Sequence, residues 1–203
     1  MKSNPDIIWL DIAESSNDEA RKAIDNLDNL SVIAVRCQTK GRGQRTNTWE
    51  SAPGENLTFS IILKDLEILP GEQIAISQIT ALSVLDYLSS HGIYAKIKLP
   101  NDIYVGSKKI CGILIENSIC SSKLIWSIIG IGINVNQTTF PSSLPNPTSI
   151  LLETIPAAIL DLDLQLVHFH KIYSTYYSDY LANRSASKLA ELDHIFTTKL
   201  LSL

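Results

Sequence analysis

The 203-residue sequence lacks the features that define several common protein classes. Its three cysteines, Cys37, Cys111 and Cys120, are too few for a disulfide framework and show no C-x-x-C spacing for structural zinc. We interpret them as reduced thiols. The longest apolar runs are strand-sized and interrupted, so neither a signal peptide nor a transmembrane helix is predicted. These absences favour a cytoplasmic protein with no membrane partner.

An excess of basic residues is also missing. The formal net charge is −4, which predicts that the molecule has no nucleic-acid partner. No helix-turn-helix pattern precedes Ile7, so we expect no operator binding. Any basic site must therefore be local. The length and the 45% hydrophobic content suit one compact domain with a sizeable core.

The sequence shows no catalytic triad and no metal-ligand cluster. His91 falls at the end of a predicted helix, and the other histidines fall within predicted helices: His168, His170 and His194. None of the four lies beside a plausible nucleophile or set of metal ligands. We interpret them as structural or surface residues and assign no metal ligands.

Hydrophobic periodicity predicts the fold class. Strands are expected at 7–13, 31–37, 56–63, 94–99, 102–105, 109–116 and 123–135. Helices are expected from residue 16, over 70–90, from about 161, and over 188–200. Strands paired with segregated helices predict an α+β fold with a mixed β-sheet flanked by helices. We expect residues 1–160 to form the core and residues 161–203 a C-terminal helical segment of the same domain.

Local signals refine these elements. Ser16 and Glu19 form an S-x-x-E capping box, and Gly92 is placed to stop the 70–90 helix. The 123–135 strand is apolar enough to be central, and three prolines predict an exposed, irregular connection over 140–150. One apolar stripe is expected on each long helix: Ala75, Ile79, Leu82, Leu85 and Leu88 on the first, and Leu162, Leu166, Phe169, Tyr173, Tyr176 and Tyr180 on the second.

A glycine-rich basic stretch, "QTKGRGQRTNTW", follows the second predicted strand, and no acidic residue occurs between Asn29 and Trp49. Gly41 and Gly43 allow positive φ angles and close approach of backbone N–H groups to a ligand. Arg42 and Arg45 add forked donors suited to carboxylate or phosphate. The stretch matches neither a Walker A loop nor G-x-G-x-x-G. It predicts either an anion-binding loop or a flexible, solvated basic loop.

A second basic group lies in "KLPNDIYVGSKKICGILIE", residues 98–116. Asn101 and Asp102 favour a turn, and Gly112 interrupts an apolar strand, as happens where a ligand approaches closely. Three lysines lie around the acidic Asp102: Lys98, Lys108 and Lys109. The alternative is a solvated lysine pair at a hairpin tip.

A third pattern is "IGIGINVN", residues 129–136. Gly130, Gly132 and Asn134 share one face of a strand by period-2 spacing. This bare face predicts either a platform for a flat ligand or tight packing of a helix on the sheet.

In order and spacing, the three stretches resemble the catalytic domain of the biotin–protein ligase (biotin–[acetyl-CoA-carboxylase] ligase) family. The matching segments are "GRGQRTNTWESAPGENL", "KLPNDIYVGSKKICGILIE" and "GIGIN". The resemblance implies a core like that of class II aminoacyl-tRNA synthetases. It also implies a two-step reaction: biotin and MgATP give biotinyl-5′-adenylate, and a lysine of a biotin carboxyl carrier domain then takes the biotin. ATP, Mg²⁺ and biotin are the implied ligands, and a homodimer is left open.

The resemblance also assigns roles to individual residues. Arg42 and Lys109 are the implied catalytic cations. Biotin would be held by Ser15, Ser16, Gln38, Gly41, Arg42, Gly43, Lys109 and Gly112. ATP and the adenylate would be held by Arg42, Arg45, Trp49, Lys98, Asn101, Asp102 and Asn134.

The sequence departs from the family pattern at two positions. Gln44 stands where an arginine is usual, and Leu99 replaces a tryptophan that we take for a core residue. We also expect the small SH3-like domain that usually follows the core to be absent. Two other readings stay open, a lipoate or octanoate ligase or transferase of the same fold and a non-catalytic biotin- or adenylate-binding remnant.

Overall fold

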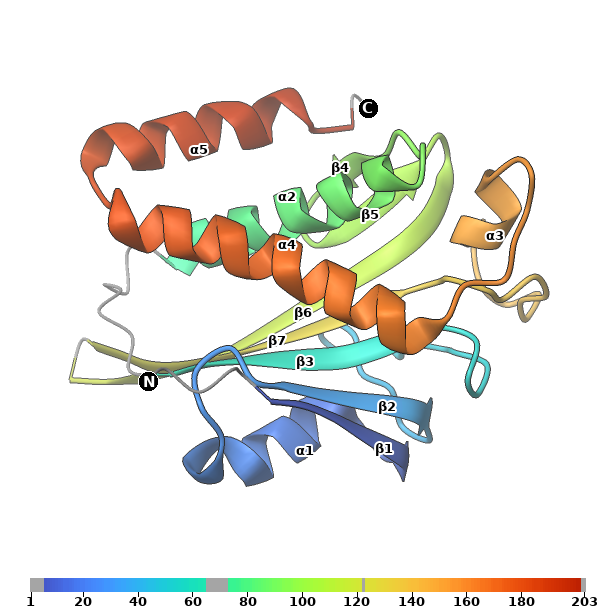
Figure 1. The fold of residues 1–203 in the computed structure, drawn as a ribbon, viewed down its shortest axis with the longest axis horizontal. Helices are drawn as coiled ribbons and strands as arrows, with labels where there is room; N and C mark the ends of the chain where they lie inside the picture. The colour runs from blue at the N-terminus through green and yellow to red at the C-terminus, as the bar shows by residue number, and fades with distance from the viewer. Residues whose placement is uncertain (1–5, 65–72, 122, 202–203) are drawn as a thin grey trace. The chain divides into compact units, whose positions relative to one another are not determined.

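The computed structural model describes residues 6–64, 73–121 and 123–201. The elements follow one another in the order shown in Figure 1: β1 (Ile7–Ala13), α1 (Ser16–Ala23), η1 (Ile24–Asn26), β2 (Val32–Gln38), β3 (Leu57–Lys64), α2 (Gln73–Ser90), β4 (Lys96–Lys98), β5 (Asp102–Val105), β6 (Lys108–Cys120), β7 (Lys123–Ile133), α3 (Ile150–Glu153), α4 (Leu162–Ala182) and α5 (Ala186–Thr198). The predicted residues 70–72 of the second helix lie outside the described residues.

The strands form one mixed sheet. Their order is β1-β2-β3-β7-β6-β5-β4, which places β7 in the centre as its apolar sequence predicted. β1 and β2 run parallel, whereas β2–β3, β3–β7 and β4–β5 are antiparallel. The predicted α+β fold class is therefore confirmed. None of the described helices combines the length and the apolar character needed to cross a membrane.

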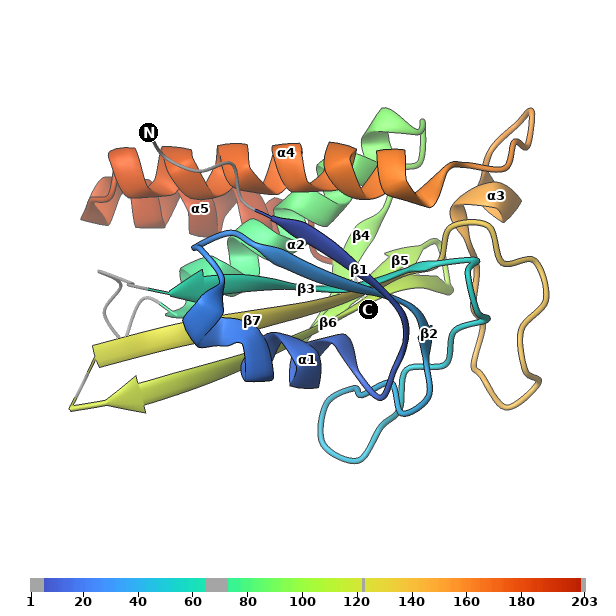
Figure 2. The ribbon, with the colours of Figure 1, turned by 60° about the horizontal axis from the view of Figure 1, so that its bottom comes forward.

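The chain divides into two compact units, and β6 passes from one to the other. Unit 1 comprises the described residues up to Lys64 and those in 112–134. There α1 packs on β2, β3 and β7, as Figure 2 also shows. Its core is apolar: Ala20, Ile24, Leu27, Ile33, Ile62 and Ile128. Each fully buried isoleucine stabilises such a core by about 1.5–3 kcal/mol relative to an exposed one.

Unit 2 comprises the described residues in 73–111 and 135–201. In it α2 contacts both α4 and α5. The expected single stripe on α2 is too narrow, because polar residues on other faces, including Gln78 and Thr80, are buried as well. Gly92 ends this helix as predicted. Its φ is 75°, and the N–H groups of Gly92 and Ile93 donate to the carbonyls of Ser89 and Leu88 at 2.9 and 3.0 Å.

Two local predictions, for the α4 stripe and for the 140–150 connection, are corrected. The buried stripe of α4 contains Tyr177 in place of Tyr176. Tyr176 lies at the edge of the stripe, where its hydroxyl donates to a carboxylate oxygen of Asp86 on α2 at 2.6 Å. Connection 140–150 is not exposed throughout, since Thr148 and its two successors are buried. Pro147 forms a β-bridge to Lys109, which draws this end of the connection onto the start of β6.

The predicted capping box is wrong. Ser15 is the N-cap of α1, and its side chain makes no capping hydrogen bond. Glu19 instead pairs with Lys22 at 2.8 Å. The N–H of Ser16 donates to Oε1 of Gln38 at 2.7 Å, so a side chain from β2 caps the helix from outside its own sequence.

Candidate functional site

The start of α1 in unit 1 carries a buried polar cluster. Ser15, Ser16 and Asn17 are each at most 5% exposed. Ser60 on β3 lies below them, with its hydroxyl 2.8 Å from Oγ of Ser16 and 2.6 Å from Oδ1 of Asn17. Hydroxyl and amide groups that are buried in this way remain suited to hydrogen-bonding a polar ligand. Neither Asn17 nor Ser60 was among the predicted site residues.

The basic stretch folds into a narrow loop over residues 41–49. Gly43 N–H donates to the Asn47 carbonyl at 2.8 Å, and Trp49 N–H donates to the Gly41 carbonyl at 3.0 Å. Arg42 and Thr48 form an antiparallel β-bridge. The expected positive φ angles at Gly41 and Gly43 are wrong, because Arg45 takes this conformation with φ 58°. Gly41 is needed for space, since a Cβ there would overlap the Trp49 carbonyl oxygen. Backbone hydrogen bonds within the loop therefore define its conformation in this structure.

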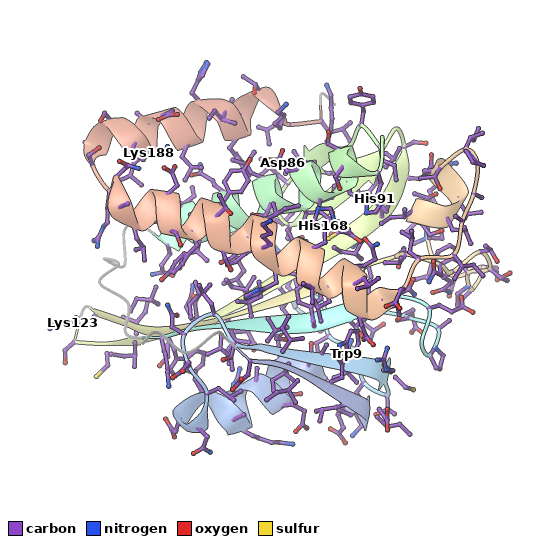
Figure 3. The ribbon with its side chains drawn as sticks, in the orientation of Figure 1. Trp9, Asp86, His91, Lys123, His168 and Lys188 are labelled. Carbon is purple, nitrogen blue, oxygen red and sulfur yellow. The ribbon has the colours of Figure 1, made fainter. Side chains whose placement is uncertain are left out.

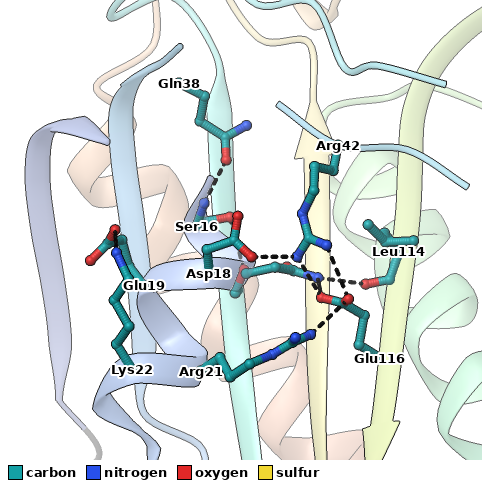
Figure 4. Close-up of polar contacts among 11 residues, drawn as sticks. Ser16, Asp18, Glu19, Arg21, Lys22, Gln38, Arg42, Leu114 and Glu116 are labelled. Atoms are coloured by element: carbon teal, nitrogen blue, oxygen red, sulfur yellow. Dashed lines mark hydrogen bonds and ion pairs between the residues drawn. The ribbon is translucent and has the colours of Figure 1, made fainter. Parts of the chain in front are cut away.

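Arg42 is paired with two carboxylates from distant parts of the chain. Its Nη1 and Nη2 donate to Oε1 and Oε2 of Glu116 at 3.1 and 2.7 Å, as Figure 4 shows. Nη2 also lies 2.9 Å from Oδ1 of Asp18. Sequence reasoning had found no acidic residue near Arg42, because Asp18 lies on α1 and Glu116 on β6. Only the strand order of unit 1 brings them together.

Glu116 accepts two further hydrogen bonds, from Nδ2 of Asn17 and Nη2 of Arg21, both at 2.8 Å. Partial burial by itself would raise the pKa of the Glu116 carboxyl. The hydrogen bonds from Asn17 and Arg42, with the charges of Arg42 and Arg21, outweigh it and lower this pKa. The carboxylate is thus ionised whenever the two arginines are in place.

The glycine face of β7 is covered in this structure. A Cβ at Gly130 would overlap the side chain of Asn17, and one at Gly132 would overlap the indole of Trp49. The helix-packing alternative is therefore correct at Gly130, because Asn17 belongs to α1. At Gly132 the face is covered by the flat indole of Trp49, which belongs to the 41–49 loop. Asn134, which follows β7, is 4% exposed.

Unit 2 groups the residues of the second basic stretch. Nζ of Lys109 lies 2.7 Å from Oδ1 of Asp102, and Nζ of Lys98 lies 4.6 Å from the centre of the Tyr104 ring. The predicted turn at Asn101 is present between β4 and β5. Lys108 is not merely solvated, since it pairs with Glu153 at 3.2 Å. Leu99 is 59% exposed, so our reading of this position as a core residue is wrong.

Only Asp102 among the predicted site residues has a carboxylate that could contact a metal ion. The described residues contain no group of three or more His, Cys, Asp or Glu side chains that could hold one. A divalent ion would therefore have to keep most of its ligands from water or from a bound phosphate, the usual arrangement for Mg²⁺.

The remaining predicted residues are placed as follows. Gly112 lies on β6 three residues after Lys109, and Arg45 is exposed at the tip of the 41–49 loop. Unit 1 thus brings together Ser15, Ser16, Gln38, Gly41, Arg42, Gly43 and Trp49, and unit 2 brings together Lys98, Asn101, Asp102 and Lys109.

The model of the biotin/lipoate A/B protein ligase family matches residues 11–134. The chain belongs to this family. The bifunctional ligase/repressor BirA of Bacillus spizizenii is 30% identical over 182 residues, which cover 87% of this chain and 55% of that protein. Biotin–protein ligase 1, chloroplastic, of Arabidopsis thaliana is 34% identical over 135 residues, which cover 64% of this chain and 36% of that protein.

Solved structures of other family members have the same fold. The Aquifex aeolicus biotin protein ligase in complex with biotin and ATP superimposes with a TM-score of 0.79 at 28% identity, covering 98% of this chain and 79% of that one. The Leishmania major biotin protein ligase in complex with biotin shares the fold at 22% identity, with a TM-score of 0.75, covering 98% and 84%. The chain spans about half the length of the BirA relatives that it matches.

Proposed function

We propose that this chain is the catalytic domain of an ATP-dependent biotin–protein ligase. In the first step a carboxylate oxygen of biotin attacks the α-phosphorus of MgATP and displaces pyrophosphate, which leaves biotinyl-5′-adenylate. In the second step the neutral Nζ of a carrier lysine attacks the acyl carbon. An amide forms, and AMP and a proton leave. The carrier is a biotin carboxyl carrier domain of a biotin-dependent carboxylase.

The observation that carries the proposal is the buried polar cluster of Ser16, Asn17 and Ser60 beside the loop that bears Arg42. Biotin has a polar ureido group at one end and a carboxylate at the other. Hydroxyl and amide groups can satisfy the ureido oxygen and N–H groups, and a guanidinium suits the carboxylate.

The same cluster disfavours a lipoate or octanoate ligase. An aliphatic chain or a dithiolane ring has no group that could hydrogen-bond to these three polar side chains, whereas the ureido group of biotin has both donors and an acceptor. A site that presents polar groups favours the ligand that can pair with them. Biotin is therefore the favoured substrate within this family.

Arg42 and Lys109 supply the positive charge that the first step requires. Two anions, a carboxylate and a triphosphate, must approach each other, and their repulsion is reduced by fixed cations and by Mg²⁺. We assign Lys109 to the reacting carboxylate and phosphate oxygens and Asp102 to orienting Lys109, from which it lies 2.7 Å away. We assign Lys98, Asn101, Trp49, Arg45 and Asn134 to the nucleotide, and Gly112 to the strand against which biotin lies.

The test is incubation of the purified chain with biotin, MgATP and an apo carrier domain, read by the intact mass of the carrier. We expect a gain of one biotinyl group. The gain should be absent without ATP and absent from a carrier whose target lysine is replaced by arginine. A parallel ATP–pyrophosphate exchange assay compares biotin, lipoate and octanoate. Exchange with lipoate or octanoate but not biotin would move the chain to the alternative substrate class, and binding without exchange would make it a non-catalytic binder.

A further inference from the structure

Glu116 was not among the predicted site residues, yet it pairs with two arginines, Arg42 and Arg21. Its two carboxylate oxygens accept both Nη groups of Arg42, at 3.1 and 2.7 Å. Such a two-point contact fixes the plane of the guanidinium as well as its position. The carboxylate is 22% exposed, so water screens this contact less than it would at an open surface.

Glu116 is also anchored independently of Arg42. Asn17 and Arg21 on α1 each donate to it at 2.8 Å, and Figure 4 shows the contact of Arg21. These two contacts hold the carboxylate from α1 and do not involve the 41–49 loop. The arrangement therefore makes Glu116 the fixed partner and Arg42 the group that is positioned.

This contact decides which donor of Arg42 remains for a ligand. Both Nη groups face Glu116, and Nη2 is shared with Asp18. Nε of Arg42 is buried and has no hydrogen-bond partner among the described residues. A buried N–H without an acceptor is costly unless a ligand oxygen supplies one.

We propose that Glu116 is the positioning residue for Arg42, fixing its guanidinium so that the Nε–H edge is left to bind an anionic oxygen of the ligand. The proposal rests on the proposed function for the identity of that ligand, the carboxylate of biotin. Glu116 does not itself touch biotin. Glu116 also accepts a hydrogen bond from Asn17, so the coupling between Glu116 and Arg42, and not the single substitution alone, distinguishes a positioning residue from a merely structural one.

The experiment measures biotin affinity by isothermal titration calorimetry in a double-mutant cycle of Glu116→Gln and Arg42→Gln. In the wild-type background, Glu116→Gln is expected to weaken biotin binding about tenfold, the loss of one charge-assisted hydrogen bond. In the Arg42→Gln background it is expected to change binding less than about twofold, because no guanidinium is left to position. Glu19→Gln is the matched control and should bind as wild type, because Glu19 is a half-buried carboxylate of α1 that pairs with Lys22 and not with Arg42.

Unchanged affinity in Glu116→Gln, or an equal loss in both backgrounds, would overturn the proposal. If Glu116→Gln does not fold, Asp18→Asn takes its place in the same cycle with the same expected pattern. Trypsin cleavage after Arg42 and Arg45 in the ligand-free protein gives a second reading. Cleavage should be faster in Glu116→Gln than in Glu19→Gln, and equal rates would refute the positioning of Arg42 by Glu116. Failure of the wild type to bind biotin would count against the proposed function, while the cleavage comparison still tests whether Glu116 holds Arg42.

Discussion

At the scale of single residues, Arg42 shows how the chemistry of a side chain depends on partners that are remote in sequence. Seen along the chain, it is an unpaired cation in a basic loop. In the folded protein, Asp18 and Glu116 neutralise it, and Glu116 lies 74 residues away. If the loop binds an anion as proposed, the anion would meet one edge of a guanidinium whose orientation is already fixed.

Lys109 provides the first prediction. Lys109→Ala should keep its fold and lose about 10²- to 10³-fold in ATP–pyrophosphate exchange with biotin, the usual effect of removing one preorganised charge. Lys108→Ala is the matched control, because Lys108 is 54% exposed and pairs with Glu153, whereas Lys109 is 30% exposed and pairs with Asp102. Circular dichroism checks the fold. Near-normal exchange in a folded Lys109→Ala, or an equal loss in both variants, would refute the assignment.

Gly132 provides the second prediction. A Cβ at this position overlaps the indole of Trp49, so Gly132→Ala must displace either the loop or the strand. We expect a loss of about 1–3 kcal/mol in the free energy of unfolding, typical of overpacking. The loss should shrink in a Trp49→Ala background, where the indole is gone. Urea denaturation of the wild type, the two single variants and the double variant measures these losses in the free energy of unfolding. Additive losses would show that Gly132 and Trp49 do not compete for space.

At the scale of elements, α2 and α4 are held together in unit 2 by aromatic and polar contacts. The rings of His91 and His168, labelled in Figure 3, lie 6.2 Å apart, and the hydroxyl of Tyr87 donates to Gln165 at 2.9 Å. Burial lowers the pKa of His91 from its ordinary value of 6.5, a hydrogen bond with Gln165 opposes this, and the charge of His168 adds to the lowering. The folded protein therefore favours the neutral form of His91.

The third prediction follows from the sign of this shift. Because the folded pKa lies below 6.5, the unfolded chain takes up a proton first as the pH falls. The contribution of His91 to stability is complete above that pH and is lost as the pH falls through the folded pKa. The free energy of unfolding should drop as the pH falls below 6.5, and the drop should be smaller in His91→Gln.

Denaturant titrations at several pH values measure this effect. His194→Gln is the matched control, since His194 is exposed on α5. The same pH dependence in wild type and His91→Gln would contradict the prediction.

At the scale of the whole molecule, local positive charge exists against a net charge of −4. Two of the predicted site cations are each paired with a carboxylate in the fold, Arg42 with Glu116 and Lys109 with Asp102. A protein built in this way attracts anions through fixed, directed donors and not through a broad positive field.

The fourth prediction concerns ligand stabilisation of the chain. Biotin and MgATP together should raise the melting temperature more than either alone, because a tightly held adenylate adds binding free energy to the folded state only. Octanoate with MgATP should give a smaller rise, since it offers no hydrogen-bonding group to Ser16, Asn17 and Ser60. Thermal shift measurements at equal ligand concentrations compare these mixtures. A larger rise with octanoate would support the alternative substrate class.

Much of the fold was predictable from the sequence because the signals are local. β1 and β5 have the predicted bounds, and Gly92 stops α2 with the positive φ that only glycine adopts without strain. Predictions failed where a distant partner replaced a local one. Gln38 caps α1 in place of the capping box, and an aspartate on α2 turns Tyr176 toward the edge of the α4 stripe.

The sequence by itself therefore determined the class of the fold, the family, and the stretches that carry polar and charged groups, because periodicity and motif spacing are properties of neighbouring residues. Only the tertiary structure decided which groups pair. The strand order places β7 between β3 and β6, and α1 packs on β2, β3 and β7. Because of this arrangement Glu116 contacts Arg42, Asn17 covers Gly130, and Trp49 covers Gly132. Hydrogen bonds and ion pairs act over a few ångströms in space, whatever the separation along the chain.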